Sequence, residues 1–364
     1  MRHSIIVLAA ALGLAGCDQQ SSLTGVLARA RANGSLGTGS NISDMGLLPG
    51  AAQASAYGVN NGGLVVGYTT VSTGAATAFG WTSAQGMTAL GVPLGWGESY
   101  AFAVNDGGTI AGAALTPQGV LHAVSWSGGV MKDLGAFTAG GSSLALGVGS
   151  DGRLVGQADA LVNGALVPHA FLYGGSTMID LGTLGGRQGS AAQDVNASGV
   201  VVGGSYLPDG TLRAFRWQAG AGMVVLPALS GQRESFAVAI NAGGDIIGFV
   251  TMAADNLTRA VIWPRTGGVA QLAGLANNVA TLAFDINDRG EIVGYSQASN
   301  GQRFKAVWWV PGTSGGYGTA EDLKAKGGVT DAYAQAISPG TGGQPTRVVG
   351  ISVSARANRG TLWR

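Results

Sequence analysis

Hydrophobic and polar positions alternate in short runs along most of this chain, and turn residues separate the runs. Between residues 99 and 134, two turns interrupt four such runs: Asn105-Asp106-Gly107-Gly108 and Ser127-Gly128. The alternation has the two-residue period of β-strands, and no stretch has a convincing helical period. The pattern therefore predicts an all-β protein of short antiparallel strands, which in this segment cover residues 99–104, 109–115, 122–126 and 129–134.

One polar pattern recurs seven times: an apolar residue, Asn, two residues, Gly, three residues and Gly. It begins at Val59-Asn60 with Gly63 and Gly67, although the third and last copies lack the Asn and the last carries an insertion around Gly343. An aromatic residue follows every copy in phase, at Trp81, Trp126, Tyr173, Trp217, Trp263, Trp309 and Trp363. Four short strands in about 45 residues match one propeller blade. We therefore expect a seven-bladed β-propeller with four-stranded blades over residues 42–364.

The first strand of each repeat has one face of small side chains. Alanine lies three positions before the Val or Ile that opens the pattern, at Ala56, Ala101, Ala145, Ala192, Ala237, Ala283 and Ala334. Small residues suit the place where seven sheets converge on one axis, because the strands come closest together there. This strand is therefore predicted to be the innermost strand of its blade.

The last repeat lacks a fourth strand at the C-terminal end of the chain. Residues 42–50 align without gaps to residues 178–186, which follow the third aromatic landmark and contain the fourth strand of their repeat. The N-terminal strand is therefore expected to complete the last blade and to close the ring, which removes an unpaired strand edge. An open repeat array is the alternative.

A position four residues before the aromatic landmark is basic in six of the seven repeats. This structural repeat ring consists of His122, His169, Arg213, Arg259, Lys305 and Arg359. One hypothesis is a cationic ring that binds an anionic ligand, such as an acidic polysaccharide. The other is a set of cross-strand ion pairs, which contribute roughly 0.2–1 kcal/mol each.

Counting across the predicted turns favours the ion pairs. Four basic residues have an acidic counterpart on the fourth strand: His122 with Asp133, His169 with Asp180, Lys305 with Asp322, and Arg359 with Asp44. The two histidines are expected to stand directly opposite their carboxylates. Asp44 and Arg359 would form a closure pair that joins the two ends of the chain. Arg213 and Arg259 face Val225 and Gln271, so these two lack a partner.

The first residues have the pattern of a targeting segment. Arg2 precedes an apolar stretch over residues 4–13, and Leu14-Ala15-Gly16-Cys17 resembles a bacterial lipobox. The resemblance implies a signal peptide at 1–16, a lipidated Cys17 with a flexible tether at 17–41, and attachment to a membrane of the cell envelope, on its periplasmic side or at the cell surface. An ordinary secretory signal with a chance cysteine is the alternative.

The third repeat carries the clearest family resemblance. His169-Ala170-Phe171-Leu172-Tyr173, followed by Asp180-Leu181-Gly182, resembles the bacterial HAF repeat family. The resemblance covers residues 42–364, and it weakens in the last copy, where Arg359-Gly360-Thr361 replaces the triplet. The family is described as probable extracellular repeat proteins, so the resemblance implies a location and an architecture but no chemistry.

The composition and a few isolated residues limit the classes of ligand and chemistry that the chain can support. A net charge of +1 argues against nucleic acid as a partner. The sequence has no metal-ligand cluster and no serine-nucleophile motif, and its Asn-Asp-Gly turns bring too few oxygens for calcium. The candidate ligand contacts lie outside the repeat pattern or beside innermost strands: Trp96, Glu98, Glu234 and Trp308. Trp96 binds a sugar or protein in one interpretation and packs over the channel in the other.

These observations predict a non-enzymatic binding or scaffolding module of the cell envelope. We expect a monomer without a cofactor or metal, whose partner is an envelope protein or a polysaccharide. The alternative is a polysaccharide- or peptide-processing enzyme with its site at the mouth of the central channel. Such an enzyme would need two carboxylates about 5–10 Å apart, and Glu98 and Glu234 are the candidates.

Overall fold

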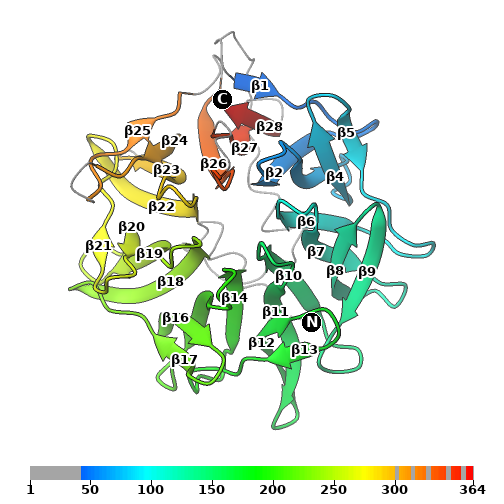
Figure 1. Ribbon diagram of the computed structural model, residues 1–364, viewed down its shortest axis with the longest axis horizontal. Coiled ribbons are helices and arrows are strands. Elements are labelled where there is room, and N and C mark those ends of the chain that lie inside the picture. Colours follow the sequence, from blue (N-terminus) through cyan, green and yellow to red (C-terminus); the bar gives the residue numbers. More distant parts are fainter. Residues whose placement is uncertain are drawn as a thin grey trace.

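A computed structural model describes residues 42–299, 303–312, 316–324, 329–341, 346–353 and 358–363. They form seven four-stranded antiparallel sheets, arranged as blades in a ring (Figure 1). The protein is therefore a seven-bladed β-propeller, as the repeat predicted. Cys17, the signal segment, the tether and Gly343 lie outside the described residues.

Each blade is built from strands that follow one another in the sequence. Blade 1 contains β2 (Gln53–Val59), β3 (Val65–Thr70), β4 (Ala76–Thr82) and β5 (Gly86–Ala89). Blade 2 contains β6 (Ser99–Val104), β7 (Ile110–Leu115), β8 (Leu121–Ser127) and β9 (Val130–Gly135). Blade 3 contains β10 (Ser143–Val148), β11 (Leu154–Val162), β12 (Ala165–Tyr173) and β13 (Met178–Asp180). Blade 4 contains β14 (Ser190–Val195), β15 (Val201–Tyr206), β16 (Leu212–Gln218) and β17 (Gly222–Val225).

The remaining blades follow the same order. Blade 5 contains β18 (Gln232–Ile240), β19 (Ile246–Met252), β20 (Thr258–Trp263) and β21 (Ala270–Gln271). Blade 6 contains β22 (Asn278–Ile286), β23 (Ile292–Ala298), β24 (Phe304–Trp309) and β25 (Glu321–Asp322). Blade 7 contains β26 (Asp331–Ile337), β27 (Val348–Val353), β28 (Asn358–Trp363) and the N-terminal β1 (Ile42–Asp44).

The first strand of every repeat is innermost, as predicted (Figure 1). It ends in the turn that begins with the motif Asn, such as Asn60 or Asn105, and we call the side of the ring with these turns the Asn face. The opposite side carries the connections between blades, such as residues 90–98, and the hairpin tips between second and third strands. We call it the crossover face.

The N-terminal strand closes the ring. β1 pairs antiparallel with β28, with Ile42 opposite Trp363 and Asp44 opposite Thr361. The backbone N–H of Met45 continues the contact by donating to the Gly360 carbonyl at 3.2 Å. Blade 7 therefore joins the two ends of the described chain, and the predicted closure is confirmed.

Every innermost strand contains a β-bulge two residues before its apolar landmark, for example between Ala56 and Gly58. Ala56 is fully buried and pairs with Gly67, the final glycine of the motif. A Cβ atom on Gly67 would overlap the Ser55 carbonyl oxygen, and the corresponding glycine of every other blade faces the same overlap. The last motif glycine is therefore required by the close approach of the two inner strands.

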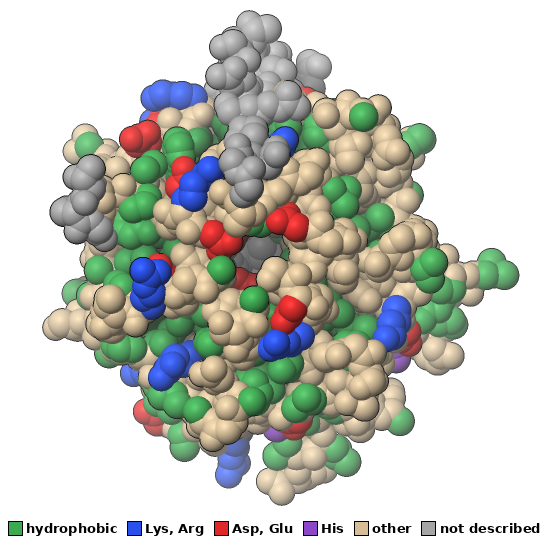
Figure 2. Space-filling view, viewed as in Figure 1, with side chains coloured by type: hydrophobic (Ala, Val, Ile, Leu, Met, Phe, Trp, Pro, Cys, Tyr) green, Lys and Arg blue, Asp and Glu red, His purple; other side chains and the backbone are tan. Residues whose placement is uncertain are grey.

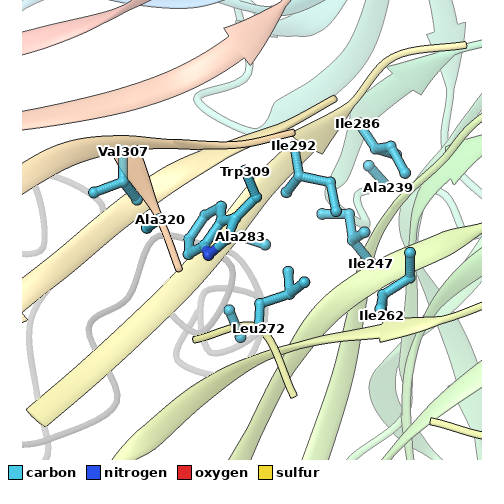
Figure 3. Close-up of a cluster of buried hydrophobic side chains, with 11 residues drawn as sticks. Ala239, Ile247, Ile262, Leu272, Ala283, Ile286, Ile292, Val307, Trp309 and Ala320 are labelled. Atoms are coloured by element: carbon cyan, nitrogen blue, oxygen red, sulfur yellow. The ribbon is translucent and has the colours of Figure 1, made fainter. Parts of the chain in front are cut away.

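Hydrophobic side chains of adjacent blades fill the space between them. Between blades 5 and 6, Ile247, Ile262 and Leu272 pack against Ile292 and Trp309 (Figure 3). The aromatic landmark also carries a directed bond here, because the Trp309 Nε1–H donates to the Ala273 carbonyl of the preceding blade at 2.7 Å. Trp126, Trp263 and Trp363 make the same bond to their preceding blades. The aromatic repeat thus fixes neighbouring blades to each other.

Candidate functional site

The motif asparagines link neighbouring blades on the Asn face. The Asn60 Nδ2–H donates to the Asn105 carbonyl of the next blade at 3.0 Å, while Asn60 Oδ1 accepts the Leu64 N–H at 3.0 Å. Asn105, Asn196 and Asn241 also donate to the next blade. These side chains therefore satisfy backbone groups at the turns, and their amides are committed to the fold rather than to a ligand.

Four basic residues of the structural repeat ring contact the carboxylates expected from the sequence. The His122 Nδ1 atom lies 3.0 Å from Asp133 Oδ1, and His169 Nδ1 lies 2.9 Å from Asp180 Oδ2. The remaining two distances are 3.1 Å for Lys305 Nζ to Asp322 Oδ2 and 3.8 Å for Arg359 Nε to Asp44 Oδ2. The closure pair thus lies across the junction of β1 and β28.

The register of these pairs differs from the prediction. Asp133 stands opposite Val124 rather than His122, and Asp180 stands opposite Phe171 rather than His169. The turn in blade 2 is formed by Gly128 and Gly129, with φ values of 57° and 79°, and not by Ser127 and Gly128. The basic and acidic side chains therefore meet as diagonal neighbours on one sheet face, which is still within reach of long side chains.

Each of these aspartates has a second structural role. Asp133 Oδ1 accepts the N–H of Gly135, and Asp180 Oδ1 accepts the N–H of Gly182, both at 2.8 Å. The pKa of Asp180 lies below its ordinary value, because the hydrogen bond from His169, the Gly182 N–H and the charge of His169 together outweigh partial burial. The Asp-x-Gly sequence therefore ends the fourth strand with an Asx turn.

The two arginines without a predicted partner behave differently. The Arg213 guanidinium donates from Nη1 to the Arg233 carbonyl at 2.7 Å. Arg259 Nη2 lies 2.5 Å from Asp255 Oδ2, so the expectation that Arg259 has no partner is wrong. Asp255 lies in the hairpin tip that precedes β20, a position that counting across the fourth strand does not reach. Five of the six basic side chains in the ring thus contact a carboxylate.

The candidate glutamates are not brought together. Glu98 Oε2 accepts the Tyr100 O–H at 2.6 Å beside β6, whereas Glu234 lies in β18 with Oε2 3.5 Å from Arg233 Nη2. Strands β6 and β18 lie on opposite sides of the ring (Figure 1). The two glutamates therefore do not form the paired carboxylates that a glycosidase needs.

The candidate tryptophans are both partly buried. Trp96 packs against the cluster between blades 1 and 2 that contains Val124 and Trp126, and its ring stands edge-on to His122 with centroids 6.4 Å apart. Trp308 packs against the cluster between blades 6 and 7, and its buried Nε1 has no acceptor among the described residues. Each indole therefore contributes to packing between blades.

Two carboxylates that the sequence analysis did not single out lie on the innermost strands. Asp194 and Asp285 immediately precede the apolar landmark, at a position that is Gly or Ala in the other five blades. Asp194 accepts the N–H groups of Val195 and, in the next blade, Ile240 at 2.8 and 2.9 Å. An acidic residue at a position that is otherwise Gly or Ala is the sequence signal that could have identified these two carboxylates.

Asp285 repeats this arrangement two blades further on. It accepts the N–H of Ile286 at 2.8 Å and that of Ile337 in blade 7 at 2.9 Å. Burial is the main cause that raises the pKa of Asp194 to about 7 and that of Asp285 to about 8. Nearby negative charge adds to it, from Asp288 for Asp194 and from Asp194 and Asp288 for Asp285. Acidic side chains also gather around the central opening (Figure 2). The carboxyls of Asp194 and Asp285 on the inner wall therefore bind a proton more readily than an exposed aspartate does.

Blade 3 carries the most distinctive exposed feature. Its β11–β12 hairpin has nine residues in each strand and closes through Asn163 and Gly164, with φ values of 51° and 82°. The hairpin reaches beyond the ring (Figure 1). Near its tip Leu161 is 63% exposed and its cross-strand partner Leu166 is 46% exposed, with Val162 at 37%. These three residues form the apolar tip.

Comparison with known proteins supports the fold. No protein-family model matches the chain, and no curated protein matches its sequence. A streptogramin B lyase is similar at 12% identity with a TM-score of 0.53, over 88% of this chain and 96% of that chain. A puromycin hydrolase mutant is similar at 14% identity with a TM-score of 0.57, over 85% of this chain and 52% of that chain. At these identities the likeness shows the propeller fold alone.

The chemistry available to this arrangement follows from its contacts. No group of three or more His, Cys, Asp or Glu side chains in the described ranges could hold a metal ion. Within those ranges, no helix is long and apolar enough to cross a bilayer. Asp194 and Asp285 are positioned to hold blades together, because each accepts a backbone N–H from the next blade.

Proposed function

We propose that the chain is a non-enzymatic binding module of the cell envelope that is attached to a membrane by lipid on Cys17. In this proposal, the apolar tip of the β11–β12 hairpin binds an envelope protein. The observation that carries it is the exposure of the cross-strand pair Leu161 and Leu166 on one face of the hairpin, with Val162 exposed on the other face. Aliphatic side chains that cluster on a surface mark interaction sites, because covering them releases hydration free energy.

A protein is a better match to the tip than a lipid surface. Residues 160–168 contain no Trp, Tyr, Lys or Arg, which anchor proteins at membrane interfaces. The outer edges of residues 160–162 and 165–167 pair with no further strand of the described chain. An extended segment of a partner can therefore add a strand to the hairpin while its side chains cover the leucines.

The position of the tip agrees with a lipid anchor at the N-terminus. β1 enters blade 7 at the Asn face, because Ile42 stands opposite Trp363. The β11–β12 hairpin tip lies on the crossover face, where second and third strands connect. A chain tethered through residues 17–41 would thus present the tip on the side away from its anchor.

The first prediction concerns the apolar tip. Leu161→Asn combined with Leu166→Asn should weaken capture of the envelope partner by at least about tenfold, because burying each leucine contributes roughly 1.5–3 kcal/mol. The measurement is crosslinking of the purified full chain to an envelope fraction, followed by affinity titration with the protein so identified. The melting temperature should stay unchanged, since both side chains are exposed.

A matched control is available on the outer strands. Ile179 is 48% exposed and Val224 is 44% exposed, so Ile179→Asn with Val224→Asn removes similar exposed apolar area away from the hairpin. The control should keep full affinity. Equal loss in both double variants, or unchanged binding in the tip variant, would refute the assignment of the tip. Turnover of envelope polysaccharide or peptide by the purified chain would favour the enzyme alternative instead.

A further inference from the structure

Blade 1 differs from the other six blades at the residue that precedes the aromatic landmark. Blade 1 has Gly80 at this place, whereas the others have Ser125, Leu172, Arg216, Ile262, Trp308 and Leu362. Leu172, Ile262 and Leu362 are buried there and fill space between strands. A Cβ on Gly80 would lie 3.4 Å from Leu64 and 3.6 Å from Leu90, which is ordinary van der Waals contact. The backbone therefore accepts a side chain that this blade lacks.

The missing side chain leaves a cavity between blades 1 and 2. It has a volume of about 220 Å³ and opens near the turns between third and fourth strands, at the Asn face. Leu64, Leu90, Ile110 and Trp126 line its apolar part. This volume is below the 300–1,000 Å³ of pockets for drug-sized ligands, so it suits a single small ring.

The polar part of the lining is neutral and offers both hydrogen-bonding roles. Thr82 Oγ1 accepts the Gln85 N–H at 3.2 Å, which leaves its own O–H free to donate. The Thr88 O–H donates to the Gly80 carbonyl at 3.2 Å, which leaves its oxygen free to accept. The exposed Gln85 amide supplies a donor and an acceptor. No residue that lines the cavity is charged, so an ionic ligand would lose hydration without gaining a counter-charge.

We infer that this cavity binds one neutral sugar ring, such as a terminal unit of an envelope polysaccharide. The C–H face of the ring would lie on Leu64, Leu90 and Ile110, and its hydroxyls would exchange hydrogen bonds with Thr82, Gln85 and Thr88. The site lies on the Asn face and shares no residue with the apolar tip. Its failure would therefore leave the proposed protein-binding role untouched.

The test measures binding of small probes to the full chain by calorimetry and ligand-observed NMR. The probes are methyl glycosides of glucose, galactose, mannose, rhamnose, fucose and N-acetylglucosamine, with glucuronic acid and cyclohexanol for comparison. At least one neutral glycoside should bind with a Kd of about 1 mM, the scale for a ligand of few atoms. Preference for glucuronic acid, or binding of cyclohexanol alone, would overturn the inference.

Gly80→Leu is the decisive variant, because it fills the cavity with the residue that blades 3 and 7 have at this place. Glycoside affinity should fall at least about tenfold. Ser125→Leu places a leucine at the equivalent position one blade further on, and this variant should bind like the wild type. Thr88→Val removes a hydroxyl from the solvent side and tests the site without altering its apolar part. It should weaken glycoside binding severalfold and leave cyclohexanol unaffected. Undiminished glycoside binding by both Gly80→Leu and Thr88→Val would place the sugar elsewhere.

Discussion

At the residue scale, the most unusual groups are the carboxyls of Asp194 and Asp285. Each is half-buried and accepts one backbone N–H from its own strand and one from the next blade. Hydrogen bonds to a carboxylate normally lower its pKa, but burial and neighbouring negative charge prevail here, so both values rise. These residues therefore couple the contact between blades to pH.

This coupling predicts a direction for stability against pH. The pKa of Asp285 is about 8 in the folded chain against an ordinary value of 3.8, so the folded state binds more protons than the unfolded state between these values. The contribution of this group to the free energy of unfolding is then full below pH 4 and declines as pH rises through 8. Asp285→Asn resembles the protonated acid, so its melting temperature should match the wild type near pH 3 and exceed it increasingly as pH rises to 9.

Thermal unfolding monitored by circular dichroism across this range checks the prediction. Asp151→Asn is a suitable control, because Asp151 is a partly exposed surface carboxylate that pairs with Arg153 rather than with a histidine. A melting-temperature difference between Asp285→Asn and the wild type that does not grow with pH would show that the carboxyl is ionised throughout. Asp194→Asn should show the same trend at slightly lower pH, since its pKa is about 7.

At the element scale, strand positions were predictable but the register of the outer pair was not. The alternation and the turn residues locate β6 at residues 99–104 and place β7, β8 and β9 to within one residue. The pairing of β8 with β9 depends on whether the two turn residues are Ser127 and Gly128 or Gly128 and Gly129. In the structure Gly128 and Gly129 form the turn, and both adopt positive φ. Three small residues in a row do not show from the sequence which two of them form the turn. The acidic and basic partners were found nevertheless, because diagonal and direct neighbours share one face.

The ion pair between Asp44 and Arg359 is predicted to stabilise the junction of β1 and β28. Asp44 contacts Arg359 and also accepts the Gly46 N–H at 2.9 Å, so Asp44→Lys removes both an ion pair and a turn bond. This variant should melt at a lower temperature than the wild type. Adding Arg359→Asp should restore the melting temperature only in part, because the turn bond stays lost. Scanning calorimetry of the two single variants and the double variant measures the coupling, and additive effects would contradict a closure pair.

At the scale of the whole molecule, the phased landmarks predicted the ring because they are the residues that join blades. The Asn, Trp and glycine positions each make or permit a contact between strands or blades. Features that do not recur in every blade cannot be predicted from the repeat. Asp194 was overlooked because its effect depends on the bulge beside it, and Gly80 because a cavity depends on all the residues around it. The repeat thus reveals the architecture, whereas residues that depart from the repeat have to be located in the structure one by one.

Ring closure can be tested by deletion. Removing residues 42–48 takes away β1 and the buried Met45, and it exposes the edge of β28. The melting temperature should fall and the chain should self-associate through the free edge, as light scattering would report. Deleting residues 18–41, the predicted tether, should change neither property. A shortened chain without residues 42–48 that remains monomeric and melts like the wild type would argue for an open array.

The pairing of β1 with β28 also has a consequence for the order of events during synthesis. β1 is among the first strands to be made, yet its partner is the last, and every other blade lies between them in the chain. Such a distant pairing forms slowly, because the intervening chain must be ordered before the contact is gained. Two complementary strand edges therefore stay unpaired until translation has delivered residue 363. The time to closure, as well as the final stability, determines how long a nascent chain is exposed to aggregation.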